Sequence, residues 1–256
     1  MRLPLITSAL LIAGGALAFE APRTATAPVI DGDPSDAAWQ QANWRELDQR
    51  VLGSMPSPTD FSGRYKLVWT PAYLYLLAEI DDDILIDARA DPLVQYWDDD
   101  TLEIFIDEDA SGGNHLEDFN AFAYHIALDN QAVDIAPSRG QVSPRLFPGH
   151  IEARWRRSVK GSAKAEATAG TQMSNSLYWE VRIAVHNDSH VYGDDLSSRV
   201  TLAAGKKLGF MVAYCDADDA RGRQHFMGDV AIKPVDGDRN RGYIDASVFG
   251  ELTLVE

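Results

Sequence analysis

The sequence predicts an all-β fold, an antiparallel β-sandwich of the immunoglobulin-like or jelly-roll-like kind, with one short helix near the N-terminus. Two observations support this prediction. Short segments in which apolar and polar residues alternate with a period of two recur along the chain, and Gly, Pro and Asp clusters separate them. Sustained helical periodicity is not seen, and a single all-β domain can reach the length of this chain, 256 residues. We therefore expect one domain over residues 19–256.

The clearest alternation lies in residues 73–80, 101–107 and 177–185. Successive side chains of a strand point to opposite faces, so each segment is expected to bury one face in the core. In residues 101–107, this rule places Glu103 and Asp107 on the face opposite the core. Weaker runs predict further strands over residues 65–69, 122–129, 150–156, 208–215 and 251–255.

A short helix is expected over residues 34–42. Asp33 is the expected N-cap, and Pro34 suits the first helical turn because its missing N–H would be unpaired there anyway. Trp39 in this segment and Trp69 in a predicted strand are expected to be buried, because a sandwich must enclose such large apolar surfaces.

Residues 1–18 have the features of a secretory signal peptide. Arg2 supplies a basic start, an apolar run follows, and Ala16-Leu17-Ala18 gives the small-x-small pattern of a cleavage site. The run is too short for a typical membrane span, although an N-terminal anchor is the alternative. We expect cleavage after Ala18 and an exported protein, periplasmic or extracellular, with no membrane span once the signal is removed.

Composition narrows the classes of partner. Acidic residues outnumber basic ones 39 to 23, which gives a formal net charge of −16. Such a chain repels phosphate backbones, so nucleic acid is not expected as a partner. The single cysteine, Cys215, excludes an internal disulfide, a CxxC redox pair and a cysteine-built zinc site.

Acidic residues gather in the predicted loops, which suggests structural calcium. Calcium takes six to eight oxygen ligands in flexible geometry, and a strand end facing a loop would present several. The residues chosen on this basis are Asp107, Asp109, Glu117 and Asp118. None of the acidic clusters fits the EF-hand pattern, and a solvated acidic surface is the alternative interpretation.

Common catalytic motifs are not found. The sequence has no GxSxG elbow, HExxH helix or phosphate-binding P-loop. His186 and His190 have HxxxH spacing, but the polar residues between them indicate a turn, so both are expected at the surface. Carboxylates are too numerous for any one pair to be identified as glycosidase-like.

Four blocks of sequence, in order, resemble the family-nine carbohydrate-binding modules. They are VIDGD with DAAW at 29–39, VWTPAYLY at 68–75, YWDDDTLEIFID at 96–107, and LGF, DAD and FGELTL within 208–254. Residues 130–207 carry no matching motif. Together the blocks span most of the chain.

The resemblance implies a non-catalytic β-sandwich with structural calcium that binds a mono-, oligo- or polysaccharide, often at a chain end, by holding one ring between two aromatic side chains. By position in the motifs, Trp97 and Tyr243 are the expected aromatic pair, although tryptophan is usual at the second place. Glu103 matches the glutamate that meets sugar hydroxyls, and His125 takes a position that is usually polar. Ala123 stands where the family pattern has arginine.

Two other functions remain open at this point. Related sandwiches include haem-binding electron-transfer domains, for which His225 and Met227 would be the candidate axial ligands. A glycoside-active enzyme is the second alternative. Modules of the family that this sequence resembles are usually attached to an enzyme. An enzyme or an uptake protein is therefore a possible partner.

Overall fold

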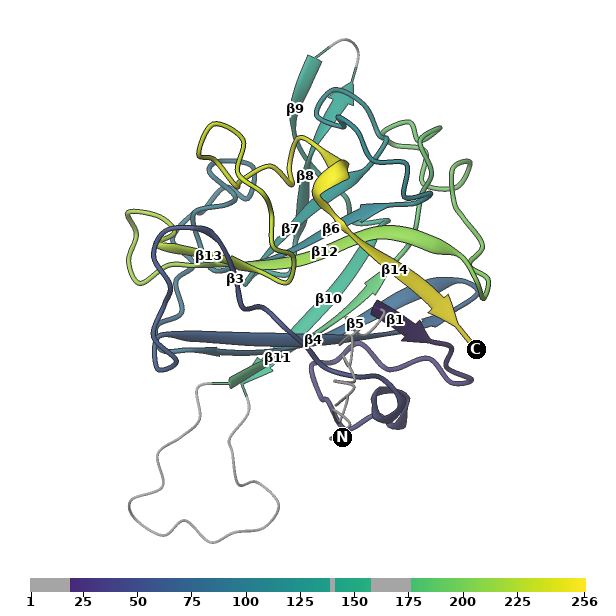
Figure 1. The fold of residues 1–256 in the computed structure, drawn as a ribbon, viewed down its shortest axis with the longest axis horizontal. Coiled ribbons are helices and arrows are strands. Elements are labelled where there is room, and N and C mark those ends of the chain that lie inside the picture. The colour runs from purple at the N-terminus through teal and green to yellow at the C-terminus, as the bar shows by residue number, and fades with distance from the viewer. Residues whose placement is uncertain (1–18, 139–140, 158–175) are drawn as a thin grey trace, which may run out of the picture.

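The computed structural model describes residues 19–138, 141–157 and 176–256, and the predicted signal peptide lies outside these ranges. Two stacked sheets enclose the main core (Figure 1). The larger sheet contains β1 (Phe19–Pro22), β3 (Gln49–Leu52), β6 (Thr101–Asp107), β7 (Phe122–Ala127), β8 (Ala132–Ser138), β9 (Gln141–Leu146), β12 (Lys207–Asp216), β13 (His225–Gly228) and β14 (Gly250–Val255). The smaller sheet contains β2 (Arg45–Glu46), β4 (Phe61–Thr70), β5 (Tyr73–Asp82), β10 (Ile151–Arg157) and β11 (Ser176–Ile183).

The larger sheet runs in the order β1-β14-β12-β6-β7-β8-β9, and β13 pairs with β12 and with β3. The smaller sheet runs β10-β11-β5-β4-β2. β1 pairs with β14 in parallel, and the other strand pairs within the described residues are antiparallel. β6 therefore lies between β12 and β7, near the middle of the larger sheet.

The predicted β-sandwich is confirmed, and its core follows the predicted alternation. The three strongly alternating segments became β5, β6 and β11. Leu102, Ile104 and Ile106 of β6 point into the core between the sheets. β5 departs from simple alternation because Tyr75 and Leu77, on its other face, are also buried. They lie in a second apolar cluster on the outer side of the smaller sheet.

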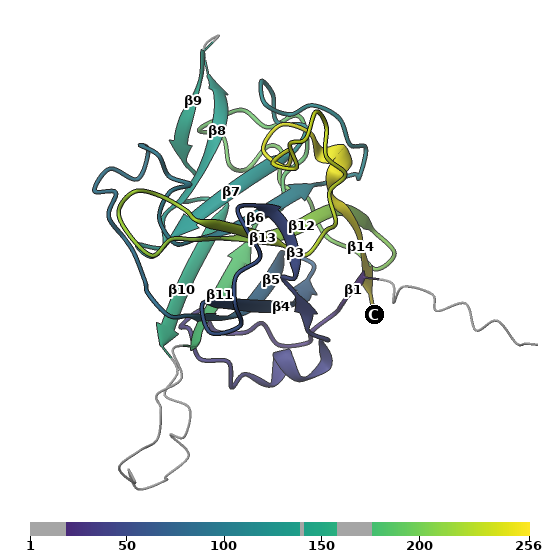
Figure 2. The same cartoon turned by 60° about the vertical axis from the view of Figure 1, so that its left-hand side comes forward.

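The N-terminal segment covers that outer face. The expected helix is present as a short 3-10 turn, η1 (Ala37–Gln41), which begins three residues later than predicted (Figure 2). Asp33 is not its N-cap, because the Asp33 carboxylate accepts the N–H of Ser35 in a local turn (3.1 Å). Asp36 precedes the turn and accepts the N–H of Val29 instead (2.7 Å).

One buried carboxylate fixes this segment to the sheet. Glu180 of β11 accepts the indole N–H of Trp39 at 2.8 Å on Oε1. Its Oε2 accepts the backbone N–H groups of Asp31 and Gly32 at 3.0 and 2.9 Å. Trp39 and Trp69 are both buried, as predicted. The Glu180 side chain thus links two parts of the first sequence block, the backbone of Asp31 and Gly32 and the side chain of Trp39.

Several short strands were not predicted, namely β1, β2, β3, β8, β9 and β13. Pro137 in β8 and Pro144 in β9 argue against strands by sequence rules. However, β9 is the last strand of its sheet and Pro137 lies in the part of β8 that pairs with β9 alone, so a lost N–H matters little at either place. β8 and β9 form a ribbon that projects beyond the sandwich in both views (Figures 1 and 2). Within the described ranges, no helix has the length and hydrophobicity of a membrane span.

His186 and His190 are buried, so the prediction of a surface location is wrong. The turn itself exists, since the N–H of His190 bonds to the carbonyl of Asn187 at 3.1 Å. The chain then folds back and brings the buried Ser198 hydroxyl to Nδ1 of both rings, at 2.9 and 3.0 Å. Local sequence spacing gives no information on this tertiary contact.

Removing the Trp39 side chain tests how much the contact between Trp39 and Glu180 stabilises the fold. We expect Trp39→Ala to lower the free energy of unfolding by about 3–5 kcal/mol, because it leaves a cavity and removes a hydrogen bond to buried Glu180. Urea unfolding followed by circular dichroism measures this loss. Trp44→Ala is the matched control, since half-buried Trp44 packs under the side chains of Arg64 and Lys66 at the surface. An equal loss in both variants would contradict the assigned role of Glu180.

Candidate functional site

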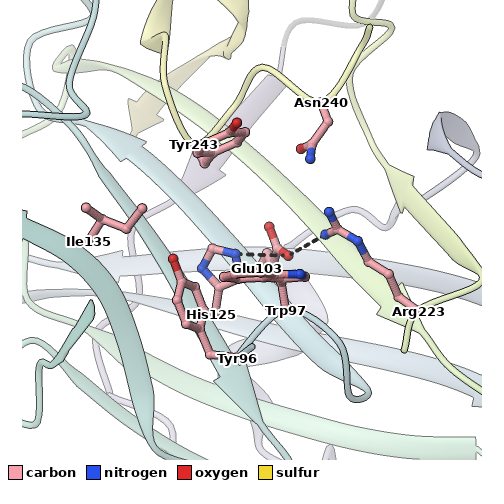
Figure 3. Close-up of a pocket in the computed structure, with 8 residues that line it drawn as sticks. All are labelled: Tyr96, Trp97, Glu103, His125, Ile135, Arg223, Asn240 and Tyr243. Carbon is pink, nitrogen blue, oxygen red and sulfur yellow. Dashed lines mark ion pairs between the residues drawn. The ribbon is translucent and has the colours of Figure 1, made fainter. Parts of the chain in front are cut away.

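A cavity of about 350 Å³ lies on the outer face of the larger sheet. Its lining consists of Tyr96, Trp97, Glu103, His125, Ile135, Arg223, Asn240 and Tyr243 (Figure 3). The structure therefore brings together all four residues that the sequence analysis chose for ligand binding. They come from two adjacent strands and two separate loops.

The strands supply the polar floor. Glu103 of β6 and His125 of β7 are directly opposite each other in the antiparallel register. Because Leu102 and Ile104 point into the core, Glu103 must point to the other face. His125 Nε2 lies 3.1 Å from Glu103 Oε1, and His125 Nδ1 pairs with the carbonyl of Ala123 at 2.9 Å.

Carboxylates in the loop between β5 and β6 fix the position of Trp97. Asp99 accepts the N–H groups of Ala88 and Arg89 at 2.9 and 2.7 Å. The Asp98 carboxylate accepts a hydrogen bond from the Arg89 guanidinium at 3.1 Å, and this contact is also an ion pair. These residues of the acidic run therefore organise the loop instead of forming a solvated surface. The Trp97 indole packs edge-to-face against Tyr96, with ring centroids 4.8 Å apart.

Close backbone contact fixes the loop that carries Tyr243. A Cβ on Gly242 would lie 2.7 Å from the Met211 side chain and 2.9 Å from that of Phe105, so a larger residue here would have to displace these side chains of the sheet. The Gly242 carbonyl also pairs with Nε2 of buried His115 at 2.8 Å. Tyr243 is thereby held across the cavity from Trp97 (Figure 3).

Glu103 is buried yet ionised. Cys215 Sγ donates to Oε1 at 2.9 Å, and Arg223 Nη1 lies 3.6 Å from the same oxygen. Burial by itself would raise the pKa of Glu103, but His125 and Arg223 outweigh it and lower that pKa. Burial likewise opposes protonation of His125, while the Glu103 carboxylate raises the pKa of His125 above 6.5. The floor of the cavity thus holds a negatively charged Glu103 whose charge is balanced by His125 and Arg223.

This arrangement suits a ligand with flat apolar faces and polar edges. Trp97 and Tyr243 are 37% and 36% exposed, unlike the fully enclosed tryptophans of the cores. Among described residues, every partner of the Glu103 carboxylate contacts Oε1, and the other oxygen points toward the space beneath Tyr243 (Figure 3). The site offers aromatic surface above and below and an ionised acceptor between.

Arg223 was missed by the sequence analysis. It lies in the loop between β12 and β13, where its guanidinium contacts Glu103 and stacks over Phe226 at 4.7 Å. Ala123, at the place where the family pattern has arginine, is a buried residue of β7. A positive charge beside Glu103 therefore comes from a different part of the chain. The sequence gives one cue, the two arginines Arg221 and Arg223 between an acidic loop and a strand.

The four carboxylates chosen for calcium are not gathered into one group. Asp107 accepts the N–H of Gly112 at 2.7 Å and pairs with neighbouring Asp109, while Glu117 and Asp118 are exposed in the wall of a different cavity. None of the four belongs to a cluster of three or more potential ligands within the described ranges. Asp107 instead closes its own loop through the backbone.

A different set of carboxylates does converge. Asp82 at the end of β5, Asp100 just before β6 and Asp216 at the end of β12 are buried, with one oxygen of each within 4.8 Å of the others. Burial, and then mutual repulsion, raise the pKa of Asp82 to about 7 and that of Asp100 to about 9. Both oxygens of Asp216 are buried without a hydrogen-bond partner among the described residues. This donor set fits a hard cation.

His225 and Met227, the two candidate haem ligands, are not arranged as a haem site. Met227 packs in the core between the sheets. His225 bonds to the carbonyl of Ser54 at 2.8 Å and lies 3.4 Å from the Asp60 carboxylate. Both side chains are therefore committed to structural contacts.

The fold and the cavity together define a β-sandwich with a ligand site on the outer face of one sheet, and sequence comparison gives the family. A family model described as "Carbohydrate family 9 binding domain-like" matches residues 30–256. The chain belongs to this family, and the resemblance read from its motifs is confirmed. Residues 130–207, which carried no recognisable motif, lie inside the match.

The relatives agree with this assignment. The chain is 32% identical over 141 residues to endo-1,4-beta-xylanase A of Thermotoga maritima, covering 53% of this chain and 13% of that protein. It is 28% identical over 189 residues to exoglucanase XynX of Acetivibrio thermocellus, covering 74% of this chain and 15% of that one. The chain thus matches a small part of these enzymes.

Solved structures share the fold. A family-nine carbohydrate-binding module from Caldicellulosiruptor kristjanssonii, in complex with cellotriose, aligns with a TM-score of 0.62 and 20% identity over 93% of both chains. The same kind of module in complex with glucose aligns at 0.60 and 19% identity, covering 92% of this chain and 95% of that one.

The ion pair on the cavity floor should make stability depend on pH. The raised pKa of His125 stabilises the fold fully below pH 6.5, and this contribution is lost as pH rises through the folded-state value. The lowered pKa of Glu103 stabilises it above pH 4.5, and that contribution is lost as pH falls through its folded-state value. We expect the difference in unfolding free energy between the parent and His125→Gln to be largest between pH 4.5 and 6.5. Urea unfolding across pH measures it, and a difference that does not decline above pH 6.5 would contradict the assignment.

Proposed function

We propose that this chain is an exported sugar-binding protein whose cavity holds the terminal ring of a neutral saccharide. One observation carries the proposal, the presence of two partly exposed aromatic rings and a buried ionised carboxylate in one cavity. Pyranose rings have apolar C–H faces and hydroxyl edges, so flat aromatic side chains bury the faces while Glu103 accepts from a hydroxyl.

The size and charge of the site support this class of ligand. A volume of about 350 Å³ is at the small end of ligand pockets, which favours one or two rings over a long internal segment. The chain carries a net charge of −16, so acidic sugars would be repelled. The cellotriose and glucose of the two similar structures, and the xylanase relatives, favour gluco- or xylo-configured saccharides.

The aromatic pair provides the sharpest test of the proposal. We expect Trp97→Ala to weaken binding of glucose or a short cello- or xylo-oligosaccharide by about thirtyfold or more, since a lost hot-spot aromatic costs about 2 kcal/mol. Tyr243→Trp should retain or strengthen binding because the larger ring covers more of the sugar face. Isothermal titration calorimetry, with circular dichroism to verify folding, measures both effects.

Trp44→Ala is again the control, because Trp44 lies on the smaller sheet away from the cavity and should leave affinity unchanged. A folded Trp97→Ala protein that binds as tightly as the parent would place the site elsewhere.

The predicted signal peptide supports periplasmic or extracellular location. The family relatives are much longer enzymes that act on polysaccharides by name, so we propose that this chain works beside such an enzyme or delivers saccharide to an uptake protein. In either role the cavity would capture chain ends released by hydrolysis.

We further propose that calcium is structural and binds at Asp82, Asp100 and Asp216 rather than at the four residues chosen from sequence. The unpartnered oxygens of Asp216 support this location. Asp100 also accepts the N–H of Ile86 at 2.6 Å and of Ala217 at 2.8 Å, so a cation there would brace the loops bearing Trp97 and Arg223. The ion would lie outside the sugar cavity.

Chelation tests this location. We expect EDTA to lower the melting temperature of the parent, because an ion bound only to the folded state stabilises it by mass action. Asp216→Asn should melt at the same temperature with and without calcium, since the variant loses the unpartnered carboxylate. Asp107→Asn is the matched control and should respond to calcium like the parent. A parent protein that EDTA leaves unchanged after prolonged dialysis, or Asp216→Asn that responds fully, would contradict the proposal.

A further inference from the structure

Three buried histidines converge at a place that shares no lining residue with the sugar cavity. They are His150, at the start of β10, and His186 and His190, in the segment that follows β11. One ring nitrogen of each lies within 4.8 Å of those of the other two. The rings of His150 and His186 are stacked, with centroids 3.8 Å apart. This group belongs to neither the sugar site nor the carboxylate cluster.

The hydrogen bonds around the group leave one nitrogen of each ring without a partner. Nδ1 of His150 pairs with the Tyr124 hydroxyl at 2.6 Å. Nδ1 of His186 and of His190 both pair with the Ser198 hydroxyl, whose oxygen has two lone pairs and can accept from both. The Nε2 atoms of all three are buried and have no hydrogen-bond partner among the described residues. Three unpaired polar atoms at one place are costly unless something binds them.

We propose that these three Nε2 atoms bind a transition-metal ion, specifically Zn²⁺, with Asp195 or a water molecule as the fourth ligand. Imidazole nitrogen is a preferred zinc ligand, and three histidines plus one oxygen is a common ligand set. An outer hydrogen bond at Nδ1 is the usual means of fixing the tautomer and orientation of a metal-binding histidine. Tyr124 and Ser198 supply such bonds.

Asp195 is placed for the fourth position. Its Oδ1 lies 3.5 Å from His150 Nε2, and its side chain is half exposed. Glycine at the neighbouring position 149 leaves room for this carboxylate, because a Cβ there would lie 2.0 Å from the Asp195 carboxylate in its present position.

The electrostatic state of the rings agrees with metal binding. Burial, and then the neighbouring rings, lower the pKa of His150 to about 2, and burial lowers that of His186 to about 4. All three rings are neutral at neutral pH, so their lone pairs are available to a cation. Zinc–nitrogen bonds of about 2.0 Å place tetrahedral ligands about 3.3 Å apart. The ring nitrogens, which lie within 4.8 Å of one another, must therefore move closer, and the stacked rings of His150 and His186 must turn so that both can face one ion.

A second cavity borders this group of histidines at His190. A cavity of about 450 Å³ has His190 in its wall and carries acidic residues on the same lining, namely Glu117, Asp118 and Asp188. Negative charge around an opening raises the local concentration of cations. Two of the residues chosen from sequence for calcium therefore lie beside the proposed zinc site instead.

The test uses protein without a polyhistidine tag, treated with a chelator and then saturated with Ca²⁺ to occupy carboxylate sites. We expect one Zn²⁺ per chain at this site by competition calorimetry. A hundredfold excess over the dissociation constant should raise the melting temperature by about 5–10 °C. Co²⁺ should give the intense visible absorption of a tetrahedral site. Calcium-saturated, folded protein that takes up no Zn²⁺, or that binds Co²⁺ with only a weak octahedral spectrum, would overturn the proposal.

Variants locate the ion. His190→Gln should abolish the Co²⁺ spectrum, and Ser198→Ala should weaken Zn²⁺ binding about 10–100-fold by freeing two Nδ1 atoms. His115→Gln is the matched control, since buried His115 pairs with Gly242 outside the group, and it should bind Zn²⁺ like the parent. Unchanged zinc affinity in His190→Gln would overturn the proposal. Should the variants not fold, the spectrum of the parent with Co²⁺ decides.

Discussion

The alternation of side chains along β6 is the constraint on which the cavity depends. Because Leu102, Ile104 and Ile106 fill the core, Glu103 is forced onto the opposite face of the same strand. A shift of one residue in register would exchange core and cavity residues along the whole strand. The stability of the sandwich therefore enforces the position of its most important polar group, and pairing with β7 brings His125 beside it.

Burying carboxylates is expensive, and this chain does so repeatedly with different compensation each time. Glu180 is satisfied by an indole and two backbone N–H groups, which joins the N-terminal segment to the smaller sheet. Glu103 is satisfied by cationic and thiol neighbours, which leaves an ionised acceptor in the cavity. Neither carboxylate oxygen of Asp216 has a hydrogen-bond partner among the described residues. The first two carboxylates are balanced by partners within the chain, whereas the third is the one that we propose to bind a cation.

Loop geometry links the acidic composition to the aromatic pair. The carboxylates that precede β6 bind backbone N–H groups and so give a fixed shape to the loop between β5 and β6. This allows Trp97 to stand partly exposed without collapsing into the core. The opposing Tyr243 is positioned by packing, through Gly242, instead of by charge. One aromatic residue therefore depends on electrostatics and the other on close contact.

The sequence by itself determined the sandwich, its inward-facing residues and the four residues Trp97, Glu103, His125 and Tyr243 that line one cavity, because strand alternation and the motif blocks are local patterns. It could not determine Arg223 as the partner of Glu103, nor the meeting of Asp82, Asp100 and Asp216, since each set joins segments far apart in the chain. For the same reason, His186 and His190 looked like surface residues of a turn. Only the tertiary structure, by folding Ser198 and His150 against them, decided that they are buried together.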